Sequence, residues 1–293
     1  MVMYILIQRY GIASQGVEVP TEREDIDDGT SVMYMACNGR LCSKMYVNYM
    51  IDELVVRCSR RSTVRNYIDI AVLGYANQGV ESLLPGDANG FIAIDRLADL
   101  MPQPQTIYID HRTPEGRSIA MPFTIHEWIK PLARGNTPMV EGLIYTYKLL
   151  DKWCRDADHR SSFPPIVIHI SDGNCNDGDT ETVVDLARMI RETRTEDGNT
   201  IFVNIHLSSC YDIISTNSEV FPAERGFATE DADKMLLYRM SSTVPRCFEG
   251  YLRGIMHLKS KGPYRAVAYN AMVNELISIL NIGTESLNNI RNL

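Results

Sequence analysis

The sequence predicts an α/β fold in which a doubly wound, mostly parallel sheet carries helices on both faces. The first observation is an alternation along the chain between apolar runs of strand length and segments whose apolar residues recur at three- and four-residue steps. The second is that the runs are continuously apolar, which is typical of strands covered on both faces. Together they favour consecutive β-α units, which build parallel sheets.

The predicted strands follow one another with a helix between most of them. They span residues 32–37, 67–74, 165–171, 200–207 and 265–269. The predicted helices span residues 47–58, 137–150, 183–190, 231–240, 245–257 and 273–280. Thr137-Pro138 predicts a helix start, with the threonine hydroxyl at the N-cap and proline at the first helical position. Gly283 is expected in a C-capping position after the last helix.

Two segments fall outside this pattern. Residues 1–30 are expected to form an N-terminal extension, in which residues 4–8 pair with residues 16–19 ahead of an acidic linker. Residues 31–293 are expected to form one domain. At about residues 100–130, two apolar stretches flank the turn sequence Thr113-Pro-Glu-Gly116, which predicts a β-hairpin insertion.

Composition and charge argue against nucleic-acid binding, a membrane span and secretion. The chain has 293 residues and a net charge of −8, and its one short basic run is Arg57, Arg60, Arg61 and Arg65, so nucleic acid is not an expected partner. The absence of a stretch of about 18 apolar residues argues against a membrane span. The short apolar N-terminus lacks a preceding basic region, which argues against a signal peptide. Seven cysteines without a CxxC pair favour reduced thiols and a cytoplasmic location.

In an open parallel sheet, ligands bind beyond the carboxyl ends of the strands. Two loops expected there are Gly135-Asn-Thr-Pro-Met139 and Ile168-His-Ile-Ser-Asp-Gly173. They resemble the Gly-Gly-Thr-Pro and Thr-Asp-Gly loops of von Willebrand factor A (vWA) domains, which are Rossmann-like. Further segments are similar to one bacterial group of stand-alone vWA proteins: residues 65–75, 196–199, 206–209, 238–242 and 281–284. The resemblance covers roughly residues 32 to 284.

The resemblance implies a metal-ion-dependent adhesion site, in which an Asp-x-Ser-x-Ser loop, a threonine and an aspartate hold Mg²⁺ or Mn²⁺ and capture a partner's carboxylate. Thr137 and Asp172 stand at two of the ligand positions. Alignment on the strand at 32–37 puts Ala36, Asn38 and Arg40 where the first loop should have Asp, Ser and Ser. The site is therefore expected to be degenerate.

We expect no tightly bound cofactor, because few oxygen ligands are left. Weak binding of Mg²⁺ or Mn²⁺ by Thr137 and Asp172, with Asn38, stays open. Our hypothesis is that Arg40, or the nearby Lys44, pairs with Asp172 and takes the place of the ion. The partner would be another protein, and the expected binding face consists of Asn38, Arg40, Asn136, Thr137, Asp172 and Asn174.

Two versions of this function are open. In one, the chain recognises its partner through a metal-free face that carries the charge of Arg40. In the other, it is a scaffold subunit, and residues 1–30 supply a strand edge for assembly.

The alternative from a different class is a hydrolase that uses His206 with Ser208 or Ser209 and Asp172. The chain has no Gly-x-Ser-x-Gly elbow, so we expect a protein without enzymatic activity. We expect His169, which lies within an apolar run, to be a hydrogen-bonded core residue.

Residues 172–181 are rich in acidic and amide side chains, and their spacing loosely resembles that of a calcium loop. The glycine falls one position late, and Val183 occupies the position of the bidentate glutamate. We therefore interpret the segment as an exposed loop whose carboxylates favour the N-terminus of the following helix.

Overall fold

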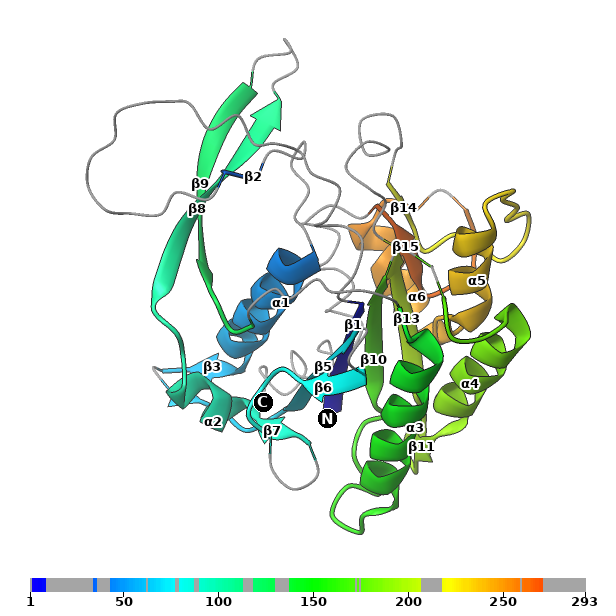
Figure 1. Cartoon of the computed structure of the whole chain (residues 1–293), viewed down its shortest axis with the longest axis horizontal. Helices are drawn as coiled ribbons and strands as arrows, with labels where there is room; N and C mark the ends of the chain where they lie inside the picture. The colour runs from blue at the N-terminus through cyan, green and yellow to red at the C-terminus, as the bar shows by residue number, and fades with distance from the viewer. Residues whose placement is uncertain are drawn as a thin grey trace.

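A mixed eight-stranded sheet forms the centre of the molecule (Figure 1). The computed structural model describes residues 2–8, 34–35, 43–61, 63–76, 79–86, 90–112, 118–129, 137–171, 173, 175–206, 218–258 and 260–270. The strand order is β14 (Glu219–Val220), β15 (Val267–Tyr269), β13 (Ile201–His206), β10 (Ile166–Ser171), β1 (Val2–Gln8), β5 (Asp69–Ala76) and β6 (Gly79–Ser82), and β7 (Ile92–Ala93) also pairs with β5. The inner strands, from β15 to β5, run parallel to their neighbours, whereas β14, β6 and β7 are antiparallel.

The strand β1 lies in the middle of this sheet. Met3 faces Ile166 of β10 on one side and Ile70 of β5 on the other. The prediction that residues 1–30 form an extension outside the α/β fold is therefore wrong for residues 2–8. The partner segment at 16–19 lies outside the described residues. Because β1 is paired on both sides, it offers no free edge for assembly, which removes the basis of the scaffold hypothesis for this strand.

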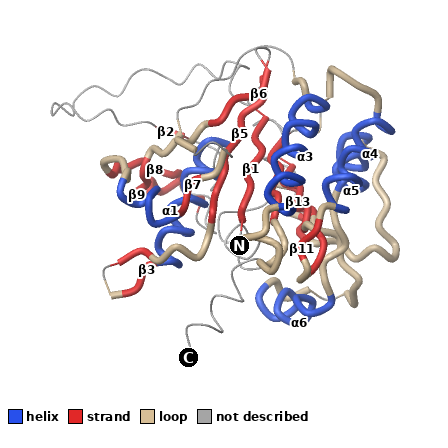
Figure 2. The backbone as a smooth tube through the Cα atoms, turned by 90° about the horizontal axis from the view of Figure 1, so that it is seen from below, coloured by secondary structure: helices blue, strands red, loops and turns tan. Residues whose placement is uncertain are grey.

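Helices cover both faces of the sheet (Figure 2). One face packs against α1 (Ser43–Cys58), α2 (Ile94–Asp99) and α6 (Arg246–Ile255). The other packs against α3 (Met139–Arg155), α4 (Thr180–Glu192) and α5 (Ala232–Met240). Side chains of β10 alternate between these layers: Ile166, Ile168 and Ile170 join the first cluster, and Val167 joins the second. This burial on both faces explains why the strand sequences are continuously apolar.

The predicted hairpin near residues 100–130 is confirmed. It consists of β8 (Pro104–Arg112) and β9 (Ser118–His126), which pair antiparallel along their whole length and stand beside α1 in Figure 1. Of the strand expected at 32–37, the described part is β2 (Tyr34–Met35), and it pairs with β8 rather than with the central sheet. Its predicted place in that sheet is therefore wrong.

The end of β9 is fastened to α1 by two polar side chains. Asp52 accepts hydrogen bonds from the backbone N–H and ring Nδ1 of His126, at 3.0 and 2.9 Å, and from Nε1 of Trp128 at 2.6 Å. Asn48 exchanges two hydrogen bonds with the backbone of Ile129. The hairpin is thus held at its base by groups that are largely removed from water.

Most of the other predicted strands and helices are present in the structure. The expected strands at 67–74, 165–171, 200–207 and 265–269 are confirmed as β5, β10, β13 and β15, and the expected helices up to residue 257 are confirmed within a few residues. Short β-hairpins that we did not predict are β3 (Ser59–Arg60) with β4 (Thr63–Val64), and β11 (Arg194–Thr195) with β12 (Gly198–Asn199). The helix expected at 273–280 and Gly283 lie outside the described residues.

Candidate functional site at the carboxyl edge of the sheet

Strand order reverses at β1. From β1 the chain continues to β5 on one side, and it returns later to place β10 on the other side. Gln8 is level with Tyr75, and Ile7 is level with Ile170, so the chain leaves β1 and β10 at the same edge of the sheet. Such a switch point is where open α/β sheets hold ligands, because the loops on its two sides diverge.

Thr137 lies at this edge and is buried. Its carbonyl oxygen accepts hydrogen bonds from the N–H of Met139 at 2.9 Å and from the N–H of Asn176 at 3.2 Å. The second bond joins the segment before α3 to the loop after β10. The structure therefore brings together the two loops that the sequence predicted to be neighbours.

The loop after β10 turns sharply at Gly173. The N–H of Gly173 donates to the hydroxyl of Ser171 at 3.1 Å, and Gly173 has a φ of +88°. A Cβ atom at this position would lie 2.6 Å from the Cβ of Asp233 in the first turn of α5. Glycine is required here for both its left-handed backbone and its small size.

Asp177 supplies the cap of α3. Its two carboxylate oxygens each accept a hydrogen bond at 3.0 Å, one from the N–H of Val140 and one from the N–H of Glu141. We predicted that the Thr137 hydroxyl would cap this helix, and that prediction is wrong: the helix begins at Met139, the N-cap residue is Pro138, and the cap comes from another loop. A carboxylate at a helix N-terminus also gains from the helix dipole.

A second carboxylate of the acidic loop also caps a helix. Asp179 is the N-cap of α4 and accepts a hydrogen bond from the N–H of Thr182 at 2.7 Å, which lowers the pKa of its carboxyl group. The interpretation of 172–181 as a loop whose carboxylates favour helix N-termini is confirmed for Asp179, and Asp177 extends it to a second helix. Cys175 lies beside Asp177, with Sγ 3.3 Å from Oδ1, and burial raises the pKa of its thiol.

His169 belongs to a buried polar chain. One ring nitrogen lies 2.8 Å from the hydroxyl of Tyr75, and the other lies 2.7 Å from the side-chain oxygen of Asn204. The amide nitrogen of Asn204 donates onward to the hydroxyl of Ser241 at 2.8 Å. Burial lowers the pKa of His169 to about 4, so the ring is neutral at pH 7. The prediction that His169 is a hydrogen-bonded core residue is confirmed.

His206 ends β13 at the same edge and is also buried. Its ring meets the ring of Tyr269 edge-on, with centroids 5.9 Å apart. The other members of the alternative hydrolase, Ser208, Ser209 and Asp172, lie outside the described residues.

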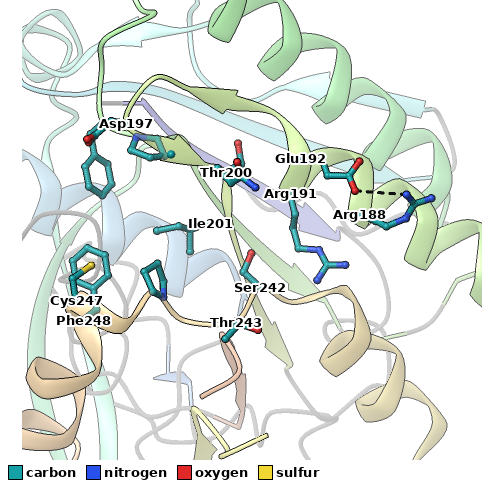
Figure 3. A pocket seen from close by; sticks show the side chains of 15 residues that line it. Arg188, Arg191, Glu192, Asp197, Thr200, Ile201, Ser242, Thr243, Cys247 and Phe248 are labelled. Carbon is teal, nitrogen blue, oxygen red and sulfur yellow. Dashed lines mark ion pairs between the residues drawn. The ribbon is translucent and has the colours of Figure 1, made fainter. Parts of the chain in front are cut away.

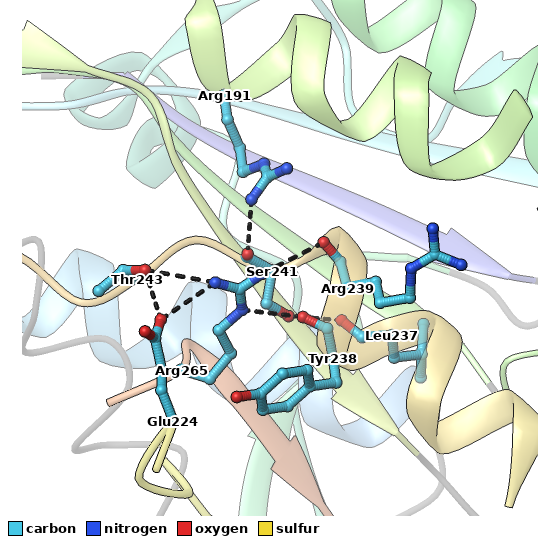
Figure 4. A network of polar contacts seen from close by, with 8 residues as sticks. All are labelled: Arg191, Glu224, Leu237, Tyr238, Arg239, Ser241, Thr243 and Arg265. Atoms are coloured by element: carbon cyan, nitrogen blue, oxygen red, sulfur yellow. Dashed lines mark hydrogen bonds and ion pairs between the residues drawn. The ribbon is translucent and has the colours of Figure 1, made fainter. Parts of the chain in front are cut away.

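A stack of rings lies beside this edge. Phe227 is parallel to Tyr238, with ring centroids 4.2 Å apart and an interplanar angle of 2°, and its centroid lies 6.1 Å from that of Tyr269. Lys234 lies over the ring of Tyr269, 5.8 Å from its centroid. Arg265 lies over the ring of Tyr238, 5.0 Å from its centroid (Figure 4). The stack fastens α5 to β15 by aromatic and cation–π contacts. It had no local signal in the sequence, because its members come from distant segments.

Of the predicted binding face, the structure describes Thr137. Five other predicted residues lie outside the described ranges: Asn38, Arg40, Asn136, Asp172 and Asn174. The strand that was expected to carry Asn38 and Arg40 to the edge belongs to the hairpin sheet, and β1 occupies the place assigned to it. Sequence reasoning missed this, although Val2–Ile7 is as continuously apolar as the strands that were found.

No family model and no curated protein matches the chain. Among solved structures, the manganese-loaded TRAP protein of Plasmodium vivax is 14% identical, with 95% of this chain and 71% of that chain covered and a TM-score of 0.41. A von Willebrand factor type A protein from Catenulispora acidiphila is 11% identical, covering 82% and 42% with a TM-score of 0.33. An aerotolerance-related membrane protein from Bacteroides fragilis is 8% identical, covering 82% and 85% with a TM-score of 0.38. These scores are too low to carry an argument, so the fold rests on strand order and packing.

No group of three or more His, Cys, Asp or Glu side chains in the described part of the chain converges in a way that could hold a metal ion. No helix within the same residues is long and apolar enough to cross a membrane.

Proposed function

We propose that this chain is a protein-recognition module of the doubly wound vWA type, and that it binds another protein at the carboxyl edge of its sheet with divalent-metal binding impaired or lost. The observation that carries the proposal is the meeting of three chain segments at one edge: the end of β1, the Thr137 segment and the loop after β10. The strand order β6-β5-β1-β10-β13-β15 supports it, because it puts the switch point at this edge.

The position of β1 changes the proposed first loop. The family pattern Asp-x-Ser-x-Ser follows the central strand next to the other two loops, and here that strand ends at Gln8. The corresponding residues are Gln8, Tyr10 and Ile12. In this reading they replace Ala36, Asn38 and Arg40 as the degenerate first loop.

This donor set does not fit a complete adhesion site. Mg²⁺ and Mn²⁺ prefer several oxygen ligands with carboxylates among them, and Gln8, Tyr10 and Ile12 offer an amide, a phenol and a hydrocarbon. The remaining family ligands are Thr137 and Asp172. We therefore propose a binding face of Asn136, Thr137, Asp172 and Asn174 together with the residues that follow β1, in which recognition does not depend on an ion.

Calorimetric titration tests the metal part of the proposal. Mg²⁺, Mn²⁺ and Ca²⁺ are titrated in turn into protein stripped with a chelator, with Asp172→Ala as the matched variant. We expect no binding tighter than millimolar for any of the ions. Micromolar binding that is lost in Asp172→Ala would contradict the proposal and restore a working adhesion site.

Site-specific photocrosslinking tests the recognition face. A photoreactive amino acid is placed at Asn174, a member of the proposed face, and at Asp197 in the β11–β12 turn as the control. In the producing cells we expect a discrete crosslinked polypeptide from position 174 and none from position 197. Equal crosslinking at both positions, or none at 174, would contradict a partner at the carboxyl edge.

The compartment is also a proposal. Cys58, Cys154, Cys175 and Cys247 are free thiols in the structure. Unpaired cysteines are usual in reducing compartments, which supports a cytoplasmic location.

A further inference from the structure

A pocket of about 670 Å³ opens at the start of β13, away from the carboxyl edge (Figure 3). It lies among the end of α4, the β11–β12 hairpin and the beginning of α6. Away from Arg191, the lining includes the apolar side chains of Phe163, Ile201 and Phe248, together with Asp197. The end at Arg191 is polar, with the guanidinium directed towards Ser242 and Thr243.

Arg191 brings a half-buried cation to this pocket. Its Nη1 donates one hydrogen bond, to the carbonyl oxygen of Ser241 at 2.9 Å. Its Nε has no exposed surface and no acceptor among the described residues. A guanidinium carries five N–H donors, and leaving such donors unsatisfied away from water is costly. The guanidinium is therefore short of acceptors: Nε is closed off from solvent, and no hydrogen bond of Nη2 is formed within the described residues.

The neighbouring charges do not neutralise Arg191. Arg265, on its other side, already pairs with Glu224 at 3.0 Å and donates to the carbonyl oxygen of Tyr238 at the end of α5 (Figure 4). Within the described residues, no carboxylate lies within ion-pair distance of Arg191. Burial, and then the positive charge of Arg265, lower the pKa of Arg191, whereas the negative charge of Glu192 raises it. A bound anion would act in the same direction as Glu192.

The other charged groups of the pocket limit what can bind. Arg188 is exposed and already bridged by Asp185 at 3.1 Å and Glu192 at 3.6 Å, so its charge is largely compensated. Asp197 lies at the opposite end of the pocket from Arg191 in Figure 3. A second negative group on the ligand would meet Asp197 or Glu192 and be repelled.

We propose that this pocket is a binding site for a small organic monocarboxylate. The carboxylate is received by the outer nitrogens of the Arg191 guanidinium, Nη1 and Nη2, whose planar fork suits two parallel hydrogen bonds. The apolar body of the ligand packs against Phe163, Ile201 and Phe248. The volume suits a small ligand and lies within the range of pockets for such molecules.

The test is calorimetric titration of the full chain with 3-phenylpropionate. Its uncharged amide, 3-phenylpropanamide, and inorganic phosphate are the comparison probes, because they lack the charge and the apolar body respectively. We expect saturable binding of the carboxylate, with both comparison probes weaker by tenfold or more, as expected when a charge-assisted hydrogen bond or an apolar contact is lost. Binding of the amide or of phosphate as tight as that of the carboxylate would overturn the proposal, as would no binding of the carboxylate.

Two variants assign the binding to Arg191. Arg191→Gln should weaken binding of the carboxylate by tenfold to one-hundredfold, whereas Arg155→Gln, which replaces an exposed arginine outside the lining of this pocket, should leave it unchanged. Because Arg191→Gln could impair folding, the unfolding temperature of the unaltered protein is also measured with each probe. We expect only the carboxylate to raise it. An unchanged affinity in Arg191→Gln, or equal stabilisation by the amide, would overturn the assignment.

Discussion

The buried ring of His169 should make the protein sensitive to mild acid. Burial lowers its pKa from 6.5 to about 4, so the folded protein resists protonation that the unfolded chain accepts. Well above pH 6.5 the ring is neutral in both states, so its burial does not make stability depend on pH. As the pH falls from 6.5 towards 4, the unfolded chain takes up a proton and the folded protein does not, so the free energy of unfolding decreases. Since one pKa unit corresponds to about 1.4 kcal/mol, the loss between pH 7.5 and 4.5 is about 2.5 kcal/mol.

Urea unfolding at pH 7.5 and 4.5 measures this loss, with His169→Gln as the matched variant. Glutamine can still hydrogen-bond to Tyr75 and Asn204 but does not titrate. We expect His169→Gln to be less stable than the unaltered protein at pH 7.5, and to lose about 2.5 kcal/mol less of its free energy of unfolding on going to pH 4.5. If both proteins lose the same free energy of unfolding over this range, the burial argument for His169 is refuted.

Three further predictions concern stability and are read from urea unfolding at pH 7.5. Asp177→Ala should lower the free energy of unfolding by about 1 kcal/mol because it removes the cap of α3. The control Asp185→Ala breaks an exposed ion pair and should lower it by less than about 0.5 kcal/mol, so equal losses would argue against the cap. Asp52→Ala should cost about 3 kcal/mol, since donors on β9 and after it lose their acceptor, and a loss below about 1 kcal/mol would show that the hairpin is held by other contacts. Gly173→Ala should cost about 2 kcal/mol or more, because the added methyl group meets Asp233 on a left-handed backbone; an unchanged midpoint would contradict this.

The parts of the fold that sequence reasoning predicted are those with a local signal. β10 and β13 were found because both of their faces are buried, and α4 was found because its apolar residues repeat at helical spacing. Strand partners have no such signal. Val2–Ile7 and Val32–Cys37 are both apolar runs, and nothing within either run shows which of them pairs with β10.

In the candidate site, too, the predictable features are those with a local signal in the sequence, and the others depend on tertiary packing. The meeting of the Thr137 segment with the loop after β10 could be predicted, because strands that are parallel deliver their loops to one edge. The cap of α3 could not, since Asp177 is far along the chain from Val140 and the bond depends on how the two loops pack. Likewise, the partial burial of Arg191 could not be predicted from its helix alone, because it depends on the packing of the end of α5 against the side chain.

The position of β1 has a consequence for how the chain is made. β1 cannot pair with β10 until Ile166, the partner of Met3, has been synthesised. During synthesis β1 therefore lacks its neighbour on one side while a long part of the chain is still being made. In the described part of the sheet, β1 is also the strand that joins β5, β6 and β7 to β10, β13, β15 and β14. Closure of the sheet is therefore a late event of high sequence separation, which predicts slow folding and a period of exposure in which a chaperone could bind the unfinished protein.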